Sequence, residues 1–245
     1  MAEITADCLS LHYKISGRMT GRFSGASAPS NLLQVGRQQF ILALKTLSFS
    51  IKNGERVGLV GRNGSGKSTL LRVLGGIYPP TEGVLQVQGQ VSSMFNLSLG
   101  IQPDASGRDN IMIRGLIKGW SHSDIEAHMD DIIEFSELTN FIDLPLRTYS
   151  TGMRMRLLFA IATSFSPDVL LLDEWIGAGD SNFQSKAATR MNTLVKNAGI
   201  VVIASHNRSL IKRVCDRAIW LDGGEMKAFG EIDEVFDKMD HEASK

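Results

Sequence analysis

A glycine-rich loop between an apolar strand and an apolar helix limits the folds that this chain can adopt. The segment 55–60 reads ERVGLV, which is typical of a buried strand, and it runs directly into GRNGSGKST at 61–69. Apolar residues then recur at helical spacing from Leu70 to Leu74, before two glycines end the pattern. A helix that begins in such a loop turns its first backbone amides and the positive end of its dipole toward an anion. The sequence therefore predicts an α/β fold with an anion site at the end of a strand.

The spacing within the loop identifies the anion as the phosphate chain of a nucleotide. The loop fits the pattern G-x-x-x-x-G-K-[ST], in which glycines let successive backbone amides point inward. Lys67 would neutralise β- and γ-phosphate oxygens, and the Ser68 hydroxyl would take one position on Mg²⁺. We expect the phosphates to be bound by Gly61, Arg62, Asn63, Gly64, Ser65, Gly66, Lys67, Ser68 and Thr69.

Two further apolar strands end on polar side chains, DVLLLDE at 168–174 and IVVIASH at 200–206. The carboxyl ends of parallel strands meet at one edge of a sheet, where open α/β sheets bind their ligands. We therefore expect Asp173 to hold Mg²⁺ through water and Glu174 to orient and deprotonate an attacking water. His206 would orient or sense the γ-phosphate. Acids that merely end a strand, and a structural histidine, are the alternatives, and the phosphate loop disfavours both.

The segment between the loop and these acids has the pattern of helices, which predicts a lobe inserted between two halves of one site. SDIEAHMDDIIEFSEL at 123–138 predicts a helix that begins with a capping box of Ser123 and Glu126. Its buried face would carry Ile125, Met129, Ile132 and Ile133. The rest of the chain predicts a strand over 3–15, two strands around a turn at 52–54, a closing hairpin with Asp-Gly at 222–223, and a helix around 231–239.

The composition of the chain is that of an ordinary globular protein and indicates no particular ligand. The chain has 245 residues, enough for one sizeable domain, and its 26 basic and 26 acidic side chains cancel. Bulk charge therefore gives no reason to expect nucleic acid or an anionic membrane surface as the main partner. Cys8 and Cys215 lie far apart, which favours neither a metal site nor a disulfide framework. We find no secretory signal and no apolar run long enough to span a membrane.

Five motifs in order make the chain similar to the ATP-binding cassette (ABC) family of transporter ATPases over nearly its whole length. They are the phosphate loop at 61–69, YSTGM at 149–153 in place of the family's LSGGQ signature, LLLDE at 170–174, GAGD at 177–180 as the D-loop, and His206 as the switch histidine. The resemblance implies ATP and Mg²⁺ as cofactors and ATP hydrolysis as the activity, with Lys67, Glu174 and His206 as catalytic residues.

The resemblance also implies a fold and its division. The fold class is α/β, a P-loop ABC ATPase with a RecA-like core, an antiparallel β-subdomain and an inserted α-helical subdomain. Residues 1–245 would form a single nucleotide-binding domain, with 1–95 and 167–245 in the core and β-subdomain and 100–166 in the helical subdomain. Some members append a C-terminal carbohydrate-binding domain, and we expect none here, because the chain ends soon after the closing hairpin and helix.

In this family the signature helix of one subunit closes over ATP held by the phosphate loop of another. This fits the residues, because Ser150 as an N-cap, the first helical amides and the helix dipole form an anion site that has no phosphate loop of its own. Ser150 and Gly152 would face the phosphate of a second copy, and Asp180 of the D-loop would contact the nucleotide. ATP would thus hold a homodimer together.

A narrower resemblance, to the branch that exports bacterial polysaccharides such as O-antigen and capsule, rests on YSTGMRMRL, DEWIGAGD and the stretch SLGIQPDASGRDNI at 98–111. Members of this branch are peripheral ATPases that dock on two copies of a separate transmembrane permease. The resemblance implies a place on the cytoplasmic side of the inner membrane, with a lipid-linked glycan contacted mainly through the permease.

Three positions depart from the family pattern or stay open. The Q-loop glutamine, a Mg²⁺ contact in the family, aligns with Asn96, although Gln102 lies nearby; Asn keeps the amide but is one methylene shorter. Tyr13 is the expected aromatic that stacks on adenine, and Phe40 is its rival. Residues 17–38 form an expected surface loop whose role the sequence leaves undecided.

Other functions remain open from sequence alone. An ATPase subunit of a lipid or drug exporter, or of an importer, would carry the same catalytic residues. A soluble ABC-type ATPase that acts on ribosomes or DNA is less favoured, because such proteins usually carry two cassettes or long coiled coils. A nucleotide-binding regulator without activity would be expected to lack Lys67, Glu174 or His206, and all three are present.

Overall fold

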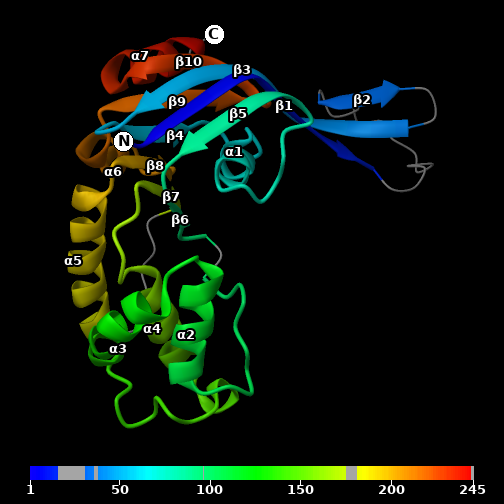
Figure 1. The fold of residues 1–245 in the computed structure, drawn as a ribbon. Coiled ribbons are helices and arrows are strands. Elements are labelled where there is room, and N and C mark those ends of the chain that lie inside the picture. Colours follow the sequence, from blue (N-terminus) through cyan, green and yellow to red (C-terminus); the bar gives the residue numbers. More distant parts are fainter. Residues whose placement is uncertain (16–30, 36–37, 96, 175–180, 244–245) are drawn as a thin grey trace. The chain divides into compact units, whose positions relative to one another are not determined.

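The computed structural model describes residues 1–15, 31–35, 38–95, 97–174 and 181–243. These residues form two compact units, and Figure 1 shows the elements of each. The first unit contains 1–93, 168–175 and 199–245, and the second contains 94–167 and 176–198.

A four-stranded antiparallel sheet forms one layer of the first unit. Its strands lie in the order β2 (Leu32–Val35), β3 (Gln38–Lys52), β1 (Glu3–Lys14) and β5 (Glu82–Gln88). Ile4, Leu9 and Leu47 of the central strands are fully buried, whereas the side chains of β5 are mostly exposed. The expected strand over 3–15 is thus confirmed as β1, in an antiparallel sheet of the kind that has one covered face.

A six-stranded sheet forms the second layer, in the order β10, β9, β4, β8, β7, β6. The pairs from β9 to β6 are parallel, and β10 is antiparallel to β9. The strand bounds are β4 Arg56–Val60, β6 Val91–Ser93, β7 Val169–Asp173, β8 Ile200–Ala204, β9 Arg217–Asp222 and β10 Glu225–Glu231. All five side chains of β8 are buried, as the continuous apolar run predicted. The expected α/β class is therefore confirmed.

The described residues of the first unit form three helices, α1 (Lys67–Leu74), α6 (Arg208–Val214) and α7 (Ile232–Ala243). Arg208 and Lys212 of α6 form ion pairs with Asp240 and Asp233 of α7, and both cations lie over the ring of Phe236. The expected C-terminal helix is therefore present and continues beyond 239, because its last turns are anchored to α6.

The two cysteines do not pair with each other. Cys8 is exposed on β1, and Cys215 is buried at the end of α6. Burial raises the pKa of the Cys215 thiol to about 12, so this thiol stays protonated and unreactive at neutral pH. The expectation of two unpaired cysteines is confirmed.

The second unit is helical and contains α2 (Gly107–Ile117), α3 (His122–Ser136), a short 3-10 helix at Leu146–Thr148, α4 (Thr151–Ala162) and α5 (Ser181–Asn197). Side chains of α2, α3 and α4 pack into one apolar core. The predicted buried face of α3 is confirmed, and the core contains Ile111, Ile125, Met129, Ile132, Ile133, Leu138, Ile142, Leu146, Tyr149, Leu157, Ala160 and Ile161.

The predicted capping box of α3 was wrong by two residues. Ser121, not Ser123, is the N-cap, and its hydroxyl accepts a hydrogen bond from the backbone amide of Asp124. The carboxylate of Asp124 in turn accepts from the Ser121 backbone amide. Glu126 instead follows the first helical turn, and its carboxylate lies 3.4 Å from Nδ1 of His122. Asp124 closes the box in place of Glu126, and the helix therefore begins two residues earlier than predicted.

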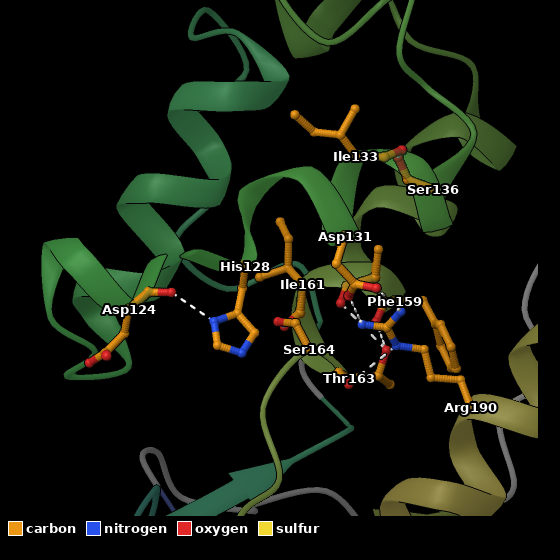
Figure 2. A network of polar contacts seen from close by, with 11 residues as sticks. Asp124, His128, Asp131, Ile133, Ser136, Phe159, Ile161, Thr163, Ser164 and Arg190 are labelled. Atoms are coloured by element: carbon orange, nitrogen blue, oxygen red, sulfur yellow. Dashed lines mark hydrogen bonds and ion pairs between the residues drawn. The ribbon is translucent and has the colours of Figure 1, made fainter. Parts of the chain in front are cut away.

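Arg190 of α5 holds α3 and the end of α4 in place within the helical unit (Figure 2). Its guanidinium donates to the carboxylate of Asp131 and to the backbone carbonyl of Thr163, which follows the last residue of α4. The same group lies 4.3 Å from the ring centroid of Phe135. One side chain therefore provides an ion pair, a cap for a helix end and a cation–π contact.

We expect Arg190→Ala to lower the free energy of unfolding by about 2 kcal/mol, because it removes charged hydrogen bonds and the packing of the arginine stem. Chemical denaturation monitored by circular dichroism measures this change. Arg213→Ala, at an exposed position of α6, serves as the control and should change stability by less than about 0.5 kcal/mol. Equal stability of the two variants would contradict a role for Arg190 in holding the helices together.

Candidate nucleotide-binding site

The glycine-rich loop connects β4 to α1, as predicted, and two of its glycines are required by the fold. Gly61 has φ of 143°, and a Cβ there would lie 2.1 Å from the carbonyl oxygen of Leu221. Gly66, the N-cap of α1, has φ of 108° and would place a Cβ 3.0 Å from the carbonyl oxygen of Ala43. Since only glycine adopts these conformations without strain, the loop can curl over the start of α1.

Lys67 begins α1 and is only 7% exposed. Its ammonium donates to the backbone carbonyls of Gly61 and Arg62, both at 2.9 Å. Burial lowers the pKa of Lys67, and the carboxylates of Asp173 and Glu174 partly oppose this effect. The loop therefore holds the Lys67 ammonium at its centre. A phosphate oxygen bound there would accept a further hydrogen bond from this cation.

Ser65 supplies an independent sign that the loop is built for a polar ligand. Its hydroxyl is buried and has no hydrogen-bond partner among the described residues. The Ser65 backbone carbonyl accepts from the amide of Gly224, which ties the loop to the β9–β10 turn. A buried hydroxyl without a partner is unfavourable by about 1–3 kcal/mol, and a phosphate oxygen would satisfy it.

The two predicted acids stand where β7 ends beside β8. Asp173 pairs in register with Ala204, and the backbone amide of Glu174 donates to the carbonyl of Ala204 at 2.8 Å. Glu174 has φ of 64°, a left-handed conformation that is uncommon for a residue other than glycine. Its carboxylate accepts from the Ser205 hydroxyl at 3.0 Å and from the His206 backbone amide at 3.1 Å. Because β7 and β8 lie side by side and parallel, the residues that follow the two strands meet at one edge of the sheet.

One cavity of about 480 Å³ gathers most of the predicted site residues. Its lining also includes residues that the sequence did not single out, from the start of β3 and from the β9–β10 turn. A signal for Gly224 was the Asp-Gly-Gly turn, whereas nothing in the sequence marked Asn31. The cavity is lined by Tyr13, Asn31, Ile41, Leu42, Ala43, Asn63, Gly64, Ser65, Gly66, Lys67, Ser68, Thr69, Asp173, Glu174, His206 and Gly224.

Of the two aromatic candidates, Tyr13 lines the cavity and Phe40 does not. The Tyr13 ring meets Tyr78 edge to face at 5.6 Å. Burial is the main cause that raises the pKa of Tyr13, and a hydrogen bond with the side chain of Thr69 opposes it. Tyr13 therefore lies at the cavity wall, with its ring against that of Tyr78.

The remaining predicted residues lie elsewhere. The side chain of Arg62 lines a second cavity of about 570 Å³, with Arg208, Trp220 and Met239 among its neighbours. Asn96, Asp180 and the rest of GAGD lie outside the described residues, as does most of the 17–38 loop. Gln102, the rival of Asn96, lies before α2. Its backbone amide donates to the side-chain oxygen of Asn110, and its backbone carbonyl accepts from the Asn110 side-chain nitrogen.

Ser150 and Gly152 belong to the helical unit, at the start of α4. Ser150 is the N-cap, as predicted, and its hydroxyl accepts from the backbone amide of Met153 at 3.2 Å. Both residues are exposed. A Cβ on Gly152 would meet only the Ser150 hydroxyl, at 3.9 Å. Glycine in a helix is unfavourable by about 0.5–1 kcal/mol relative to alanine, and the packing of the described residues does not require it there.

Taken together, the parallel sheet, the curled loop and the acids at the strand ends define a P-loop nucleotide-binding protein. The family model described as "ABC transporter" matches residues 44–177. This chain belongs to the ABC transporter family of ATPases. That finding confirms the family resemblance drawn from the five motifs and the expected fold class, and it makes ATP the nucleotide.

Among curated proteins, the chain is 46% identical over 195 residues to the O-antigen export system ATP-binding protein RfbB of Myxococcus xanthus, covering 80% of this chain and 45% of that protein. It is 47% identical over 184 residues to RfbE of Yersinia enterocolitica, with 75% and 77% covered. It is 40% identical over 193 residues to the teichoic acids export protein TagH of Enterococcus faecalis, with 79% and 43% covered. The chain thus spans less than half of two of these relatives and about three quarters of the third.

Solved structures show the same fold at low sequence identity. An ATP-binding subunit of an ABC transporter superposes with a TM-score of 0.70 at 20% identity, over 96% of this chain and 92% of that chain. A dimeric ATP-binding cassette in a post-hydrolysis state, bound to ADP and Pi, has a TM-score of 0.65 at 21% identity, over 94% and 98%. No helix of the part of the chain described here is long and apolar enough to cross a membrane.

Proposed function

We propose that this chain is the ATP-hydrolysing subunit of an ABC exporter for a bacterial cell-surface polysaccharide, with O-antigen as the first candidate cargo. The observation that carries the cargo is the identity of 46–47% to two ATP-binding proteins named for O-antigen export. The teichoic acid export proteins extend the candidates to other cell-envelope polymers. The observation that carries the hydrolysis is the single cavity that holds the phosphate loop, Asp173, Glu174 and His206.

The proposal assigns roles to the phosphate loop, Glu174, His206 and Tyr13, which line the cavity, and to Asp180. Lys67, the loop amides and the Ser65 hydroxyl bind phosphate oxygens. Glu174 orients the attacking water and accepts its proton, and His206 contacts the γ-phosphate. Tyr13 borders the adenine. Asp180 contacts the nucleotide from the D-loop.

Mg²⁺ fits the donors at this site. The Ser68 hydroxyl and the Asp173 carboxylate both line the cavity, and both are oxygen donors of the kind that Mg²⁺ prefers. When bound, Mg²⁺ neutralises charge on the β- and γ-phosphates. We propose that Ser68 contacts Mg²⁺ through its hydroxyl and Asp173 through a water molecule, with Asn96 as a third contact.

We further propose that two copies of the chain enclose two ATP molecules. Support comes from the exposed start of α4, where Ser150 caps the helix and contacts within the described part of the chain do not account for a glycine at position 152. Helix N-termini attract phosphate through their free amides and dipole. On the cytoplasmic side of the inner membrane, this homodimer would dock on a separate transmembrane permease, which contacts the glycan.

Deletion of the gene in its host tests the cargo. We expect loss of polysaccharide from the cell surface and accumulation of the lipid-linked glycan inside, restored by the wild-type chain but not by Lys67→Ala. Analysis of extracted glycans by gel and mass spectrometry identifies the polymer. Unchanged surface polysaccharide and a change in lipid or drug efflux would contradict the proposal and favour another ABC transporter.

A further inference from the structure

The carboxylate of Glu174 is held by a residue that no catalytic role accounts for. Ser205 lies directly after β8 and is 4% exposed, and its hydroxyl donates to Oε2 of Glu174 at 3.0 Å. The other carboxylate oxygen, Oε1, accepts from the backbone amide of His206 at 3.1 Å. Both oxygens of the carboxylate are therefore fixed by neighbouring residues of one strand end.

The surroundings of Ser205 fix the direction of its hydroxyl. Its oxygen accepts a hydrogen bond from the backbone amide of Asn207 at 3.2 Å. That amide occupies a lone pair of the oxygen, so the hydroxyl hydrogen is directed to Glu174. Asn207 is itself anchored as the N-cap of α6, because its side chain accepts from the amide of Leu210.

The Glu174 side chain needs such a holder. Glu174 is exposed, and a long exposed side chain ordinarily samples several rotamers. Its backbone is in the left-handed region, with φ of 64°, which is unfavourable unless neighbouring contacts maintain it. The Ala204 carbonyl accepts from the backbone amide of Glu174 and the Ser205 hydroxyl donates to its carboxylate, so the last residue of β8 and the residue after it fix Glu174 at both ends.

We propose that Ser205 is a positioning residue for ATP hydrolysis, which keeps the Glu174 carboxylate in one orientation at the edge of the phosphate cavity. This inference rests on the proposed role of Glu174. A misplacement of a reacting group by about 1 Å can slow a reaction up to about 100-fold, so a single hydrogen bond that fixes a base has a measurable effect on turnover.

Ser205→Ala should lower kcat for ATP about tenfold and leave KM within about twofold, since Ser205 contacts the base and not the phosphate loop. Ser205→Thr retains a hydroxyl and should retain most of the activity. Ser136→Ala is the matched control, because it removes a buried serine hydroxyl that donates to a backbone carbonyl in the helical unit. We expect no change in its kcat.

A double mutant separates positioning from a structural effect. In the Glu174→Ala background, Ser205→Ala should change the residual rate by less than about twofold, because the group that Ser205 orients is gone. A further tenfold loss in that background, a rise in kcat for Ser205→Ala alone, or equal losses in Ser205→Ala and Ser205→Thr would overturn the proposal. Near-normal turnover by Glu174→Ala alone would overturn the proposed role of Glu174 instead, so the two failures are distinguishable.

Discussion

Glu174→Gln is expected to lower ATP turnover by at least about 100-fold while ATP still binds. The glutamine amide is nearly the same shape as the carboxylate and can remain near Ser205 and His206, but it cannot accept a proton from water. Loss of a general base typically slows catalysis about 10²- to 10⁴-fold. Release of phosphate under saturating Mg-ATP, with a fluorescent ATP analogue to measure affinity, gives both quantities.

Asp173→Asn provides the comparison for this variant. It removes the charge of the adjacent acid, which the proposal assigns to Mg²⁺, so its defect should depend on the Mg²⁺ concentration. The defect of Glu174→Gln should be independent of Mg²⁺ once the site is saturated. If Glu174→Gln retained more than about a tenth of wild-type turnover, Glu174 would not be the base.

The second large effect is expected from Gly152→Asp at the start of α4. An acid in the first turn of a helix complements the helix dipole and stabilises it by about 0.3–1 kcal/mol, and the position has open space for a side chain. The isolated chain should therefore be as stable as the wild type or more so. Turnover should nevertheless fall to background, because the new carboxylate would face the phosphate held by a second copy and repel it.

This opposition between stability and activity makes the variant informative. Asn140→Asp adds the same charge at another exposed position of the helical unit and should leave turnover within about twofold. Thermal melts and phosphate release on the three proteins test the prediction. Wild-type turnover in Gly152→Asp would mean that the start of α4 does not approach a nucleotide.

Parts of the fold were predictable because they depend on local patterns. Buried parallel strands such as β8 are continuous apolar runs, and the buried face of α3 follows helical spacing. The loop at 61–69 was recognisable because its glycines are required by backbone geometry, as the close approach of Gly61 to Leu221 demonstrates.

Other features were not predictable because they depend on contacts between distant segments or on competing local choices. Ser205 reaches Glu174 only because β7 and β8 pair in register, and neither segment alone carries that information. The left-handed backbone of Glu174 has no sequence signal either. For α3, two serines two residues apart each had an acid three positions later, and Ser121 with Asp124 formed the box.

Whether two copies of this chain enclose ATP is tested most directly by the mass of the Glu174→Gln protein in saturating Mg-ATP. Sedimentation equilibrium should give a dimer with two bound ATP molecules, since ATP is bound but not hydrolysed, and a monomer without nucleotide. Glu174→Gln combined with Gly152→Asp should bind ATP and remain monomeric. A Glu174→Gln protein that is saturated with ATP yet monomeric, or a double variant that dimerises equally well, would contradict the shared site.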